Sequence, residues 1–165
     1  MAWEAIFTTA KAIVTELNEK NNFSFVVLDA DGKVLGSDFV GSDQMKGGAI
    51  AKGNVVIQDK SDAKLWNPAT KFGGCGICYV MCGCCCCDFN MLMGALCCTK
   101  KLHLLGALPV KLEDGSIGAL CVAGSNDCEV DKEIARRALD GNGYVLREGC
   151  WVSASAPETM DREVV

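Results

Sequence analysis

Thiols are the most concentrated reactive groups in this sequence. The stretch Phe72–Cys98 holds nine of the twelve cysteines and a single charged residue, Asp88. A Cys-x-x-Cys pair and the cysteines after it indicate a zinc or iron–sulfur site, with Cys75, Cys78, Cys82 and Cys84 as candidate ligands. However, a second Cys-x-x-Cys pair, typical of zinc ribbons, is missing. The four consecutive cysteines Cys84–Cys87 also cannot all converge on one ion from a regular strand or helix.

Three other interpretations of Phe72–Cys98 stay open. Clustered cysteines beside an apolar run and the lysine pair Lys100–Lys101 are typical of S-acylated segments, in which two or more acyl chains anchor a domain to a membrane. The segment is also long enough for a transmembrane helix, although Asp88 and the many glycines and cysteines count against one. Finally, cysteines can act as compact hydrophobic residues in a buried connector or a docking surface.

The length and charge of the whole chain limit its class. With 165 residues the chain is expected to form one domain with a substantial core. Its net charge of −5 argues against sequence-independent nucleic-acid binding, which needs a basic surface. The first twenty residues have no apolar secretory core, so we expect a reducing compartment, either the cytoplasm or the interior of an organelle, and not secretion.

The residues before the cysteine-rich stretch predict a helix, a hairpin and a second helix. Apolar side chains recur at helical spacing over residues 2–19, and strand-forming residues flank Asp31-Gly32 in Phe23–Val40. The second helix is expected over residues 44–60, where Lys52 interrupts the apolar stripe. We expect its stem to lie along the core while its ammonium reaches water. Three glycines in this helix, Gly47, Gly48 and Gly53, indicate close packing or close approach of a ligand.

The residues after the stretch predict a second hairpin and a third helix. Strands are expected over Leu102–Leu112 and Ile117–Gly124, joined by a turn that contains Asp114-Gly115. Ser125, Asn126 and Asp127 are candidate N-caps for a helix that ends near Gly141. The sequence thus predicts a domain over residues 1–143, with residues 72–98 as a connector and residues 144–165 as a C-terminal tail.

Two blocks of sequence resemble the GlcG/HbpS-like heme-binding family, which also includes the C-terminal domain of PduO. The first is the hairpin and second helix, where Ala49-Ile50-Ala51-Lys52 carries the match. The second runs from Gly106 to Leu139 and includes Leu108-Pro109-Val110, Ile117-Gly118-Ala119 and Asp131-Lys132-Glu133-Ile134-Ala135. The chain departs from the family pattern where Ala107, Cys121 and Ala123 replace two glycines and a serine.

The resemblance implies an α+β fold. It would be a profilin-like, three-layer domain, with a central antiparallel sheet of about five strands and helices on both faces. Members of the family usually form dimers or larger symmetric assemblies, so a homo-oligomer is also implied.

His103 is the candidate residue for heme binding. It is the only histidine, so a metal site with several histidines cannot be built within one chain. An imidazole or thiolate on an apolar wall can be an axial heme ligand, and His103, Cys97 and Cys98 are the candidates. A Cys-x-x-Cys-His sequence is absent, which excludes covalent c-type attachment. A lone histidine at the start of a strand is also typical of a structural or surface residue.

Two functions follow from these features. The first is a heme-, tetrapyrrole- or small-ligand-binding protein, which we expect to be non-catalytic because no nucleophile is visibly paired with a base. The second is a structural or assembly subunit that docks onto a protein partner through residues 72–98. Membrane association is expected only if the chain is acylated or belongs to a membrane complex.

Overall fold

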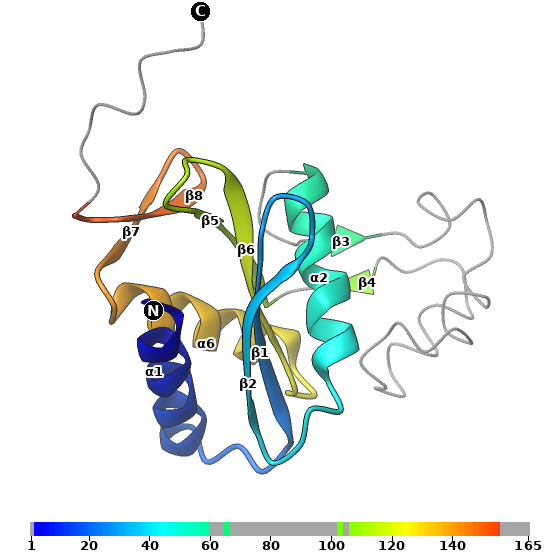
Figure 1. The fold of residues 1–165 in the computed structure, drawn as a ribbon. Coiled ribbons are helices and arrows are strands. Elements are labelled where there is room, and N and C mark those ends of the chain that lie inside the picture. The colour runs from blue at the N-terminus through cyan, green and yellow to red at the C-terminus, as the bar shows by residue number, and fades with distance from the viewer. Residues whose placement is uncertain (1, 60–64, 67–101, 104–105, 156–165) are drawn as a thin grey trace, which may run out of the picture.

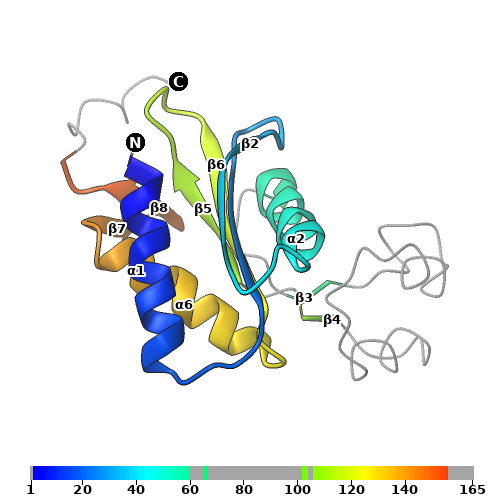
Figure 2. The same cartoon turned by 60° about the horizontal axis from the view of Figure 1, so that its bottom comes forward.

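The computed structural model describes residues 2–59, 65–66, 102–103 and 106–155, which form a sheet between two helical layers (Figures 1 and 2). The helices are α1 (Ala2–Glu16), α2 (Lys46–Asp59) and α6 (Cys128–Asp140). The strands of the main sheet are β1 (Phe23–Leu28), β2 (Val34–Val40), β5 (Ala107–Lys111), β6 (Ile117–Ala123), β7 (Tyr144–Arg147) and β8 (Cys150–Ser153). Two short strands, β3 (Leu65–Trp66) and β4 (Leu102–His103), form a separate pair.

The main sheet has six strands in the order β2-β1-β6-β5-β8-β7. All neighbours are antiparallel except β5 and β8, which pair in parallel through Val110 and Trp151. Helix α2 covers one face of the sheet, and α1 and α6 cover the other. The predicted three-layer α+β fold is therefore confirmed.

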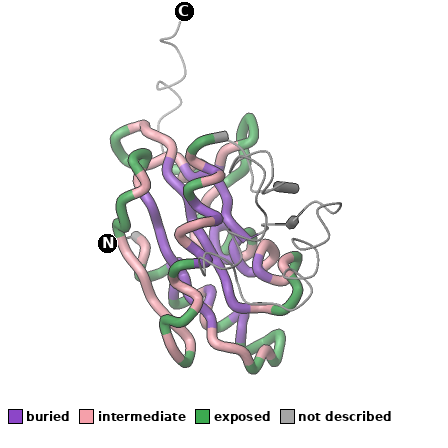
Figure 3. The backbone as a smooth tube through the Cα atoms, turned by 90° about the vertical axis from the view of Figure 1, so that its right-hand side faces the viewer, coloured by how far each residue is buried: buried purple, intermediate pink, exposed green. Residues whose placement is uncertain are grey.

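Each face of the sheet has its own core because successive strand residues point to opposite sides. On β1, Phe23, Phe25 and Val27 pack with α1 and α6, whereas Val26 and Leu28 pack with α2. All six residues of β1 are buried, which explains its nearly continuous apolar sequence. Figure 3 shows this buried centre flanked by partly and fully exposed outer elements.

The two predicted hairpins differ in how closely they match the structure. The first is confirmed. β1 and β2 pair antiparallel, with Phe23 opposite Val40 at one end and Leu28 opposite Val34 at the other. In the second, the strand expected over Leu102–Leu112 is split, because Leu102 and His103 pair with β3 whereas Ala107–Lys111 pair with β6. Leu65 and Trp66 form β3, the partner strand of β4.

Ten residues expected in the tail belong to the folded domain. Residues 144–153 form β7 and β8, which extend the sheet beyond β5, so that it has six strands where about five were expected. Their apolar pattern is weak because β7 is a short edge strand, on which Val145 and Leu146 are exposed. The predicted end of the domain at residue 143 is therefore too early, because it excludes two strands that pair with the main sheet.

Candidate functional site

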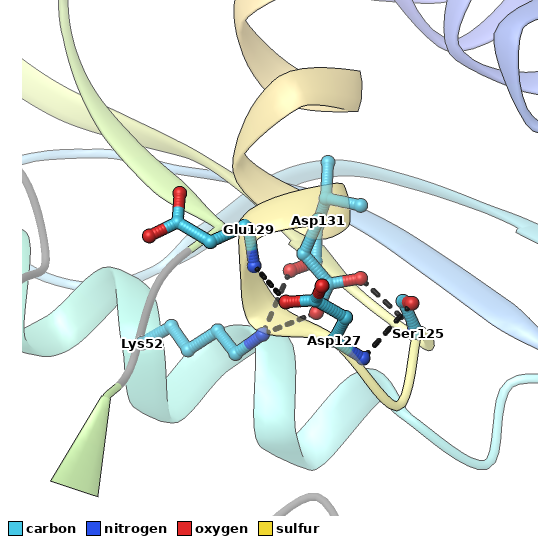
Figure 4. Close-up of polar contacts among 6 residues, drawn as sticks. Lys52, Ser125, Asp127, Glu129 and Asp131 are labelled. Atoms are coloured by element: carbon cyan, nitrogen blue, oxygen red, sulfur yellow. Dashed lines mark hydrogen bonds and ion pairs between the residues drawn. The ribbon is translucent and has the colours of Figure 1, made fainter.

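A buried ion pair between Lys52 and Asp131 connects helix α2 with the first turn of helix α6. The Lys52 Nζ atom is 2.7 Å from Asp131 Oδ2, and both side chains are almost completely shielded from solvent. Nζ also donates a hydrogen bond to the backbone oxygen of Val122, at 3.2 Å. Figure 4 shows the lysine reaching from α2 to the first turn of α6. The pair thus connects two helices that cover opposite faces of the sheet.

Helix α2 places Lys52 on its buried face. Ala49, Lys52, Gly53 and Val56 are all buried, at the spacing expected for one side of a helix. The expectation that the Lys52 ammonium reaches water is wrong. Its side chain is 0% exposed because Asp131 and the Val122 carbonyl provide the partners that water would otherwise supply.

The first turn of α6 places Asp131. Asp127 caps this helix, as its side chain accepts a hydrogen bond from the Glu129 N–H at 2.9 Å. One turn further, Asp131 Oδ1 accepts a hydrogen bond from the Ser125 N–H, also at 2.9 Å (Figure 4). Burial raises the pKa of Asp131, while the Lys52 ammonium and the backbone N–H groups of Ser125 and Gly124 oppose that rise.

Gly106 packs against this ion pair, and its lack of a side chain leaves room for Lys52 and Asp131. It has a φ of +108°, a backbone conformation that favours glycine. A side-chain carbon at this position would lie 2.5 Å from the Val122 oxygen, 2.7 Å from Asp131 Cβ and 3.2 Å from Lys52 Nζ. The Gly106 oxygen in turn accepts a hydrogen bond from the Val122 N–H at 2.6 Å. We call Lys52, Asp131, Gly106 and Val122 the clamp.

Cys121 lies near the clamp on the α2 face of β6. Burial raises the pKa of its thiol to about 12, against a smaller opposing effect of the Lys52 charge. The thiol is therefore protonated at neutral pH and is neither a good nucleophile nor a good metal ligand. It packs instead with Leu28, Val26 and Ala119.

The clamp has the chemistry of a structural anchor. Its charges neutralise each other and are shielded from solvent, so neither group is placed to exchange a proton with a substrate in this conformation. What the clamp does fix is Gly106, the residue immediately before β5 and three positions after His103 in the chain.

The structure places one of the predicted site residues in an element. His103 belongs to β4, where it pairs with Leu65 of β3. Figures 1 and 2 both place this strand pair on the α2 side of the sheet. The other candidates lie outside the described residues, namely Cys75, Cys78, Cys82 and Cys84 for a metal and Cys97 and Cys98 for heme. The ligand roles of His103 and of these cysteines stay predictions.

Two kinds of feature are absent from the described part of the chain. No three His, Cys, Asp or Glu residues of this part gather into a group that could hold a metal ion. Within the same part, none of the helices has the length and apolar character needed to cross a membrane.

Sequence reasoning missed the role of Lys52 and Asp131, although each left a signal. Lys52 stands in the apolar stripe of α2. Asp131 precedes Ile134, Ala135 and Ala138 by three, four and seven residues, which puts it on the buried stripe of α6. One cation and one anion, each alone on an apolar helix face, indicate a buried ion pair between the two helices.

Comparison with known proteins identifies the fold. No protein-family model and no curated protein matches this chain. Among solved structures, the protein ORFY of Klebsiella pneumoniae, described with the family DUF336, is 18% identical with a TM-score of 0.55, over 88% of this chain and 90% of that one. A PduOC:heme complex is 16% identical with a TM-score of 0.52, over 83% and 88% of the two chains. HbpS is 20% identical with a TM-score of 0.49, over 84% and 86%.

The chain therefore has the fold of ORFY and PduOC across most of its length. The resemblance to the GlcG/HbpS-like family is confirmed at the level of the fold. Both sequence blocks that carry the resemblance contribute to the clamp, since Ala49–Lys52 includes its lysine and Asp131–Ala135 begins with its aspartate.

Proposed function

We propose that this protein is a non-catalytic binding module for heme or a similar flat tetrapyrrole. The observation that carries the proposal is the fold shared with the PduOC:heme complex over 83% of the chain. The position of His103 supports it, because β4 lies on the α2 side of the sheet and precedes the clamp residue Gly106 by three positions in the chain.

The residues near β4 fit such a ligand chemically. An imidazole nitrogen can coordinate heme iron, and His103 is flanked in sequence by Leu102, Leu104 and Leu105. On α2, Gly47 is exposed, and a side-chain carbon added there would meet nothing within 4 Å. A glycine at such a position lets a flat ligand approach the helix backbone closely. In this arrangement His103 would hold the iron, with Cys97 or Cys98 as the alternative ligand.

Lys52 has no part in ligand binding under this proposal. Its ammonium is paired with Asp131 and is not accessible to the carboxylates of a tetrapyrrole. Those carboxylates would instead form ion pairs with exposed lysine or arginine side chains.

Titration with hemin tests this function. We expect the Soret band to shift and saturate at about one hemin per chain, as one axial site requires. Replacing His103 with alanine should abolish the shift or change its position, because the iron loses its imidazole ligand. The double variant Cys97→Ser/Cys98→Ser is the matched control for thiolate ligation.

The assignment of the ligand depends on comparing these variants. The triple variant combines His103→Ala with Cys97→Ser and Cys98→Ser. An identical Soret shift in the wild type, His103→Ala and the triple variant would show that none of these three residues binds the iron. The absence of any shift in the wild type would contradict heme binding itself.

A second candidate function is assembly, favoured by the β3–β4 pair. Antiparallel pairing of Leu65–Trp66 with Leu102–His103 brings the two ends of segment 67–101 to one place on the α2 side. The chain thus leaves and re-enters the described part at paired residues, with the cysteine-rich residues 72–98 in between, as expected for an added docking segment. An exposed Leu146 on the edge strand β7 further supports self-association.

Native size measurement tests the assembly function. We expect the full chain to form a homo-oligomer or a stable complex in native extract, and a chain with residues 72–98 replaced by a Gly/Ser linker to lose the protein partner. A stable, free monomer of the full chain would contradict the assembly function. Intact mass and metal content of the same sample would reveal acylation or a bound zinc or iron–sulfur cluster, the weaker alternatives for this segment.

A further inference from the structure

We propose that the edge strand β7 is a self-pairing surface, along which a second copy of this chain adds its own β7 in antiparallel orientation. The main sheets of the two copies would then continue into one another. This inference deepens the assembly function, on which it rests for its purpose, because it names a surface for self-association outside residues 72–98. It is independent of heme binding.

β7 leaves one row of backbone groups without a strand to pair with. It is the last strand of the main sheet, so its only strand neighbour in the described part of the chain is β8. Just before β7 begins, the Gly143 oxygen accepts a hydrogen bond from the Ala154 N–H, at 2.8 Å. Because bonded and non-bonded pairs alternate along an antiparallel ladder, the odd-numbered residues of β7 also bond to β8. The N–H and C=O groups of Tyr144 and Leu146 therefore point to the open edge.

The side chains of β7 are apolar and exposed. Leu146 is 58% exposed, more than any other large apolar side chain among the described residues, and its neighbour Val145 is also exposed. Helix α2 packs on β1, β5 and β6, whereas the β7–β8 hairpin lies beyond β5 at the outer end of the sheet (Figures 1 and 2). An open edge with exposed apolar side chains, and without lysine or proline, favours the addition of another strand.

The opposite edge of the sheet, β2, is protected from such pairing. Its Asp38 forms an ion pair with Lys11 of α1, and its ladder with β1 has a register shift beside Leu28. Charges and bulges on an edge strand disfavour the addition of a further strand. By contrast, the β7–β8 ladder is regular, and the one charged residue of β7, Arg147, stands next to the turn. β7 is therefore the edge that can accept a second chain.

One register of the two β7 strands fits both the backbone and the side chains. Outward-pointing groups must meet, and most of them pair when Tyr144 lies opposite Leu146 of the partner subunit and Leu146 opposite the partner subunit's Tyr144. Val145 then faces the partner subunit's Val145 at the two-fold axis. All three cross-strand pairs are apolar or aromatic, as in stable antiparallel ladders. Arg147 lies opposite Gly143 of the partner subunit, so no like charges meet.

Amide hydrogen exchange in the full chain, followed by NMR, tests this pairing residue by residue. Strands of four residues give a small interface, so we expect the dimer to form only as the protein concentration rises. The Tyr144 and Leu146 amides should then exchange at least several-fold more slowly, because each gains a carbonyl partner on the second chain. The Val145 and Arg147 amides are the internal control, since they bond to β8 in either state and should change much less.

Leu146→Lys should abolish the dimer, because it places a charge in the middle of the paired edge. The fold should stay intact, since the Leu146 side chain is mostly exposed. Leu35→Lys is the matched control, because Leu35 is 42% exposed on the opposite edge strand, β2. Sedimentation over a range of concentrations should show a monomer for Leu146→Lys and a dimer for Leu35→Lys and the wild type. If Leu146→Lys does not fold, the exchange measurement on the wild type decides alone.

The outcomes separate this inference from the functions proposed above. A wild type that associates while the Tyr144 and Leu146 amides exchange at their dilute rate would overturn the β7 dimer and leave assembly through residues 72–98 standing. Slow exchange of both amides at every concentration would mean that a segment of the same chain covers the edge, and would also overturn it. Loss of the dimer in Leu146→Lys would support the inference whether or not the wild type binds hemin.

Discussion

Replacing Lys52 with methionine is expected to lower the free energy of unfolding by about 3–5 kcal/mol, because it leaves Asp131 as an unpaired charge in the interior. Both side chains are almost fully shielded from solvent, so water cannot replace the lost partner. Asp131→Leu should have a comparable effect, because it removes the carboxylate that neutralises the buried Lys52 ammonium.

The double variant Lys52→Met/Asp131→Leu should recover most of this loss. The attraction between two buried charges is largely offset by the cost of removing them from water, so an apolar pair of similar volume is often equally stable. Urea unfolding of the wild type, both single variants and the double variant gives the coupling between the two positions.

The matched control for this cycle is the ion pair between Lys11 and Asp38. Its side chains are 40% and 37% exposed, so Lys11→Met should cost no more than about 1 kcal/mol. Equal losses from Lys52→Met and Lys11→Met would contradict the buried ion pair, as would single and double clamp variants that lose stability additively.

The second large effect is expected at Gly53, where helix α2 packs directly on β1 and β6. A side-chain carbon there would lie 2.4 Å from Cys121 Sγ and 2.6 Å from Leu28 Cδ1. Both neighbours are completely buried. Gly53→Ala should therefore destabilise the protein by about 1–3 kcal/mol, as typical for an overpacked core, despite the better helix propensity of alanine.

Gly47→Ala, in the same helix, is the internal control. It meets no atom within 4 Å and should be neutral or stabilise the protein by up to about 1 kcal/mol. Thermal unfolding of both variants checks the difference. If Gly53→Ala is as stable as Gly47→Ala, the close packing of α2 on β6 and β1 is wrong.

The parts of the fold set by local patterns could be predicted from the sequence. The first helix, the β1–β2 hairpin and helix α6 each combine a regular apolar period with clear end signals, such as Asp31-Gly32 and the N-cap Asp127. These signals act within a few residues, so no tertiary information is needed to read them.

Features that depend on distant partners could not be predicted. β7 and β8 have weak patterns of their own and belong to the sheet only because β8 pairs with β5, some forty residues earlier. Lys52 and Asp131 are 79 positions apart, and the burial of each makes sense only once the other is present. The same limit applies to His103, since its short strand is defined by a partner, Leu65, across the cysteine-rich segment.

The absorption spectrum of the full-length protein, purified from cells supplied with heme, tests the central claim most directly. The account predicts a Soret band at about one heme per chain, and a clearly altered or missing band for His103→Ala purified in parallel. A colourless wild-type protein with the intact mass of the bare chain, from cells in which a known heme protein is loaded normally, would contradict it.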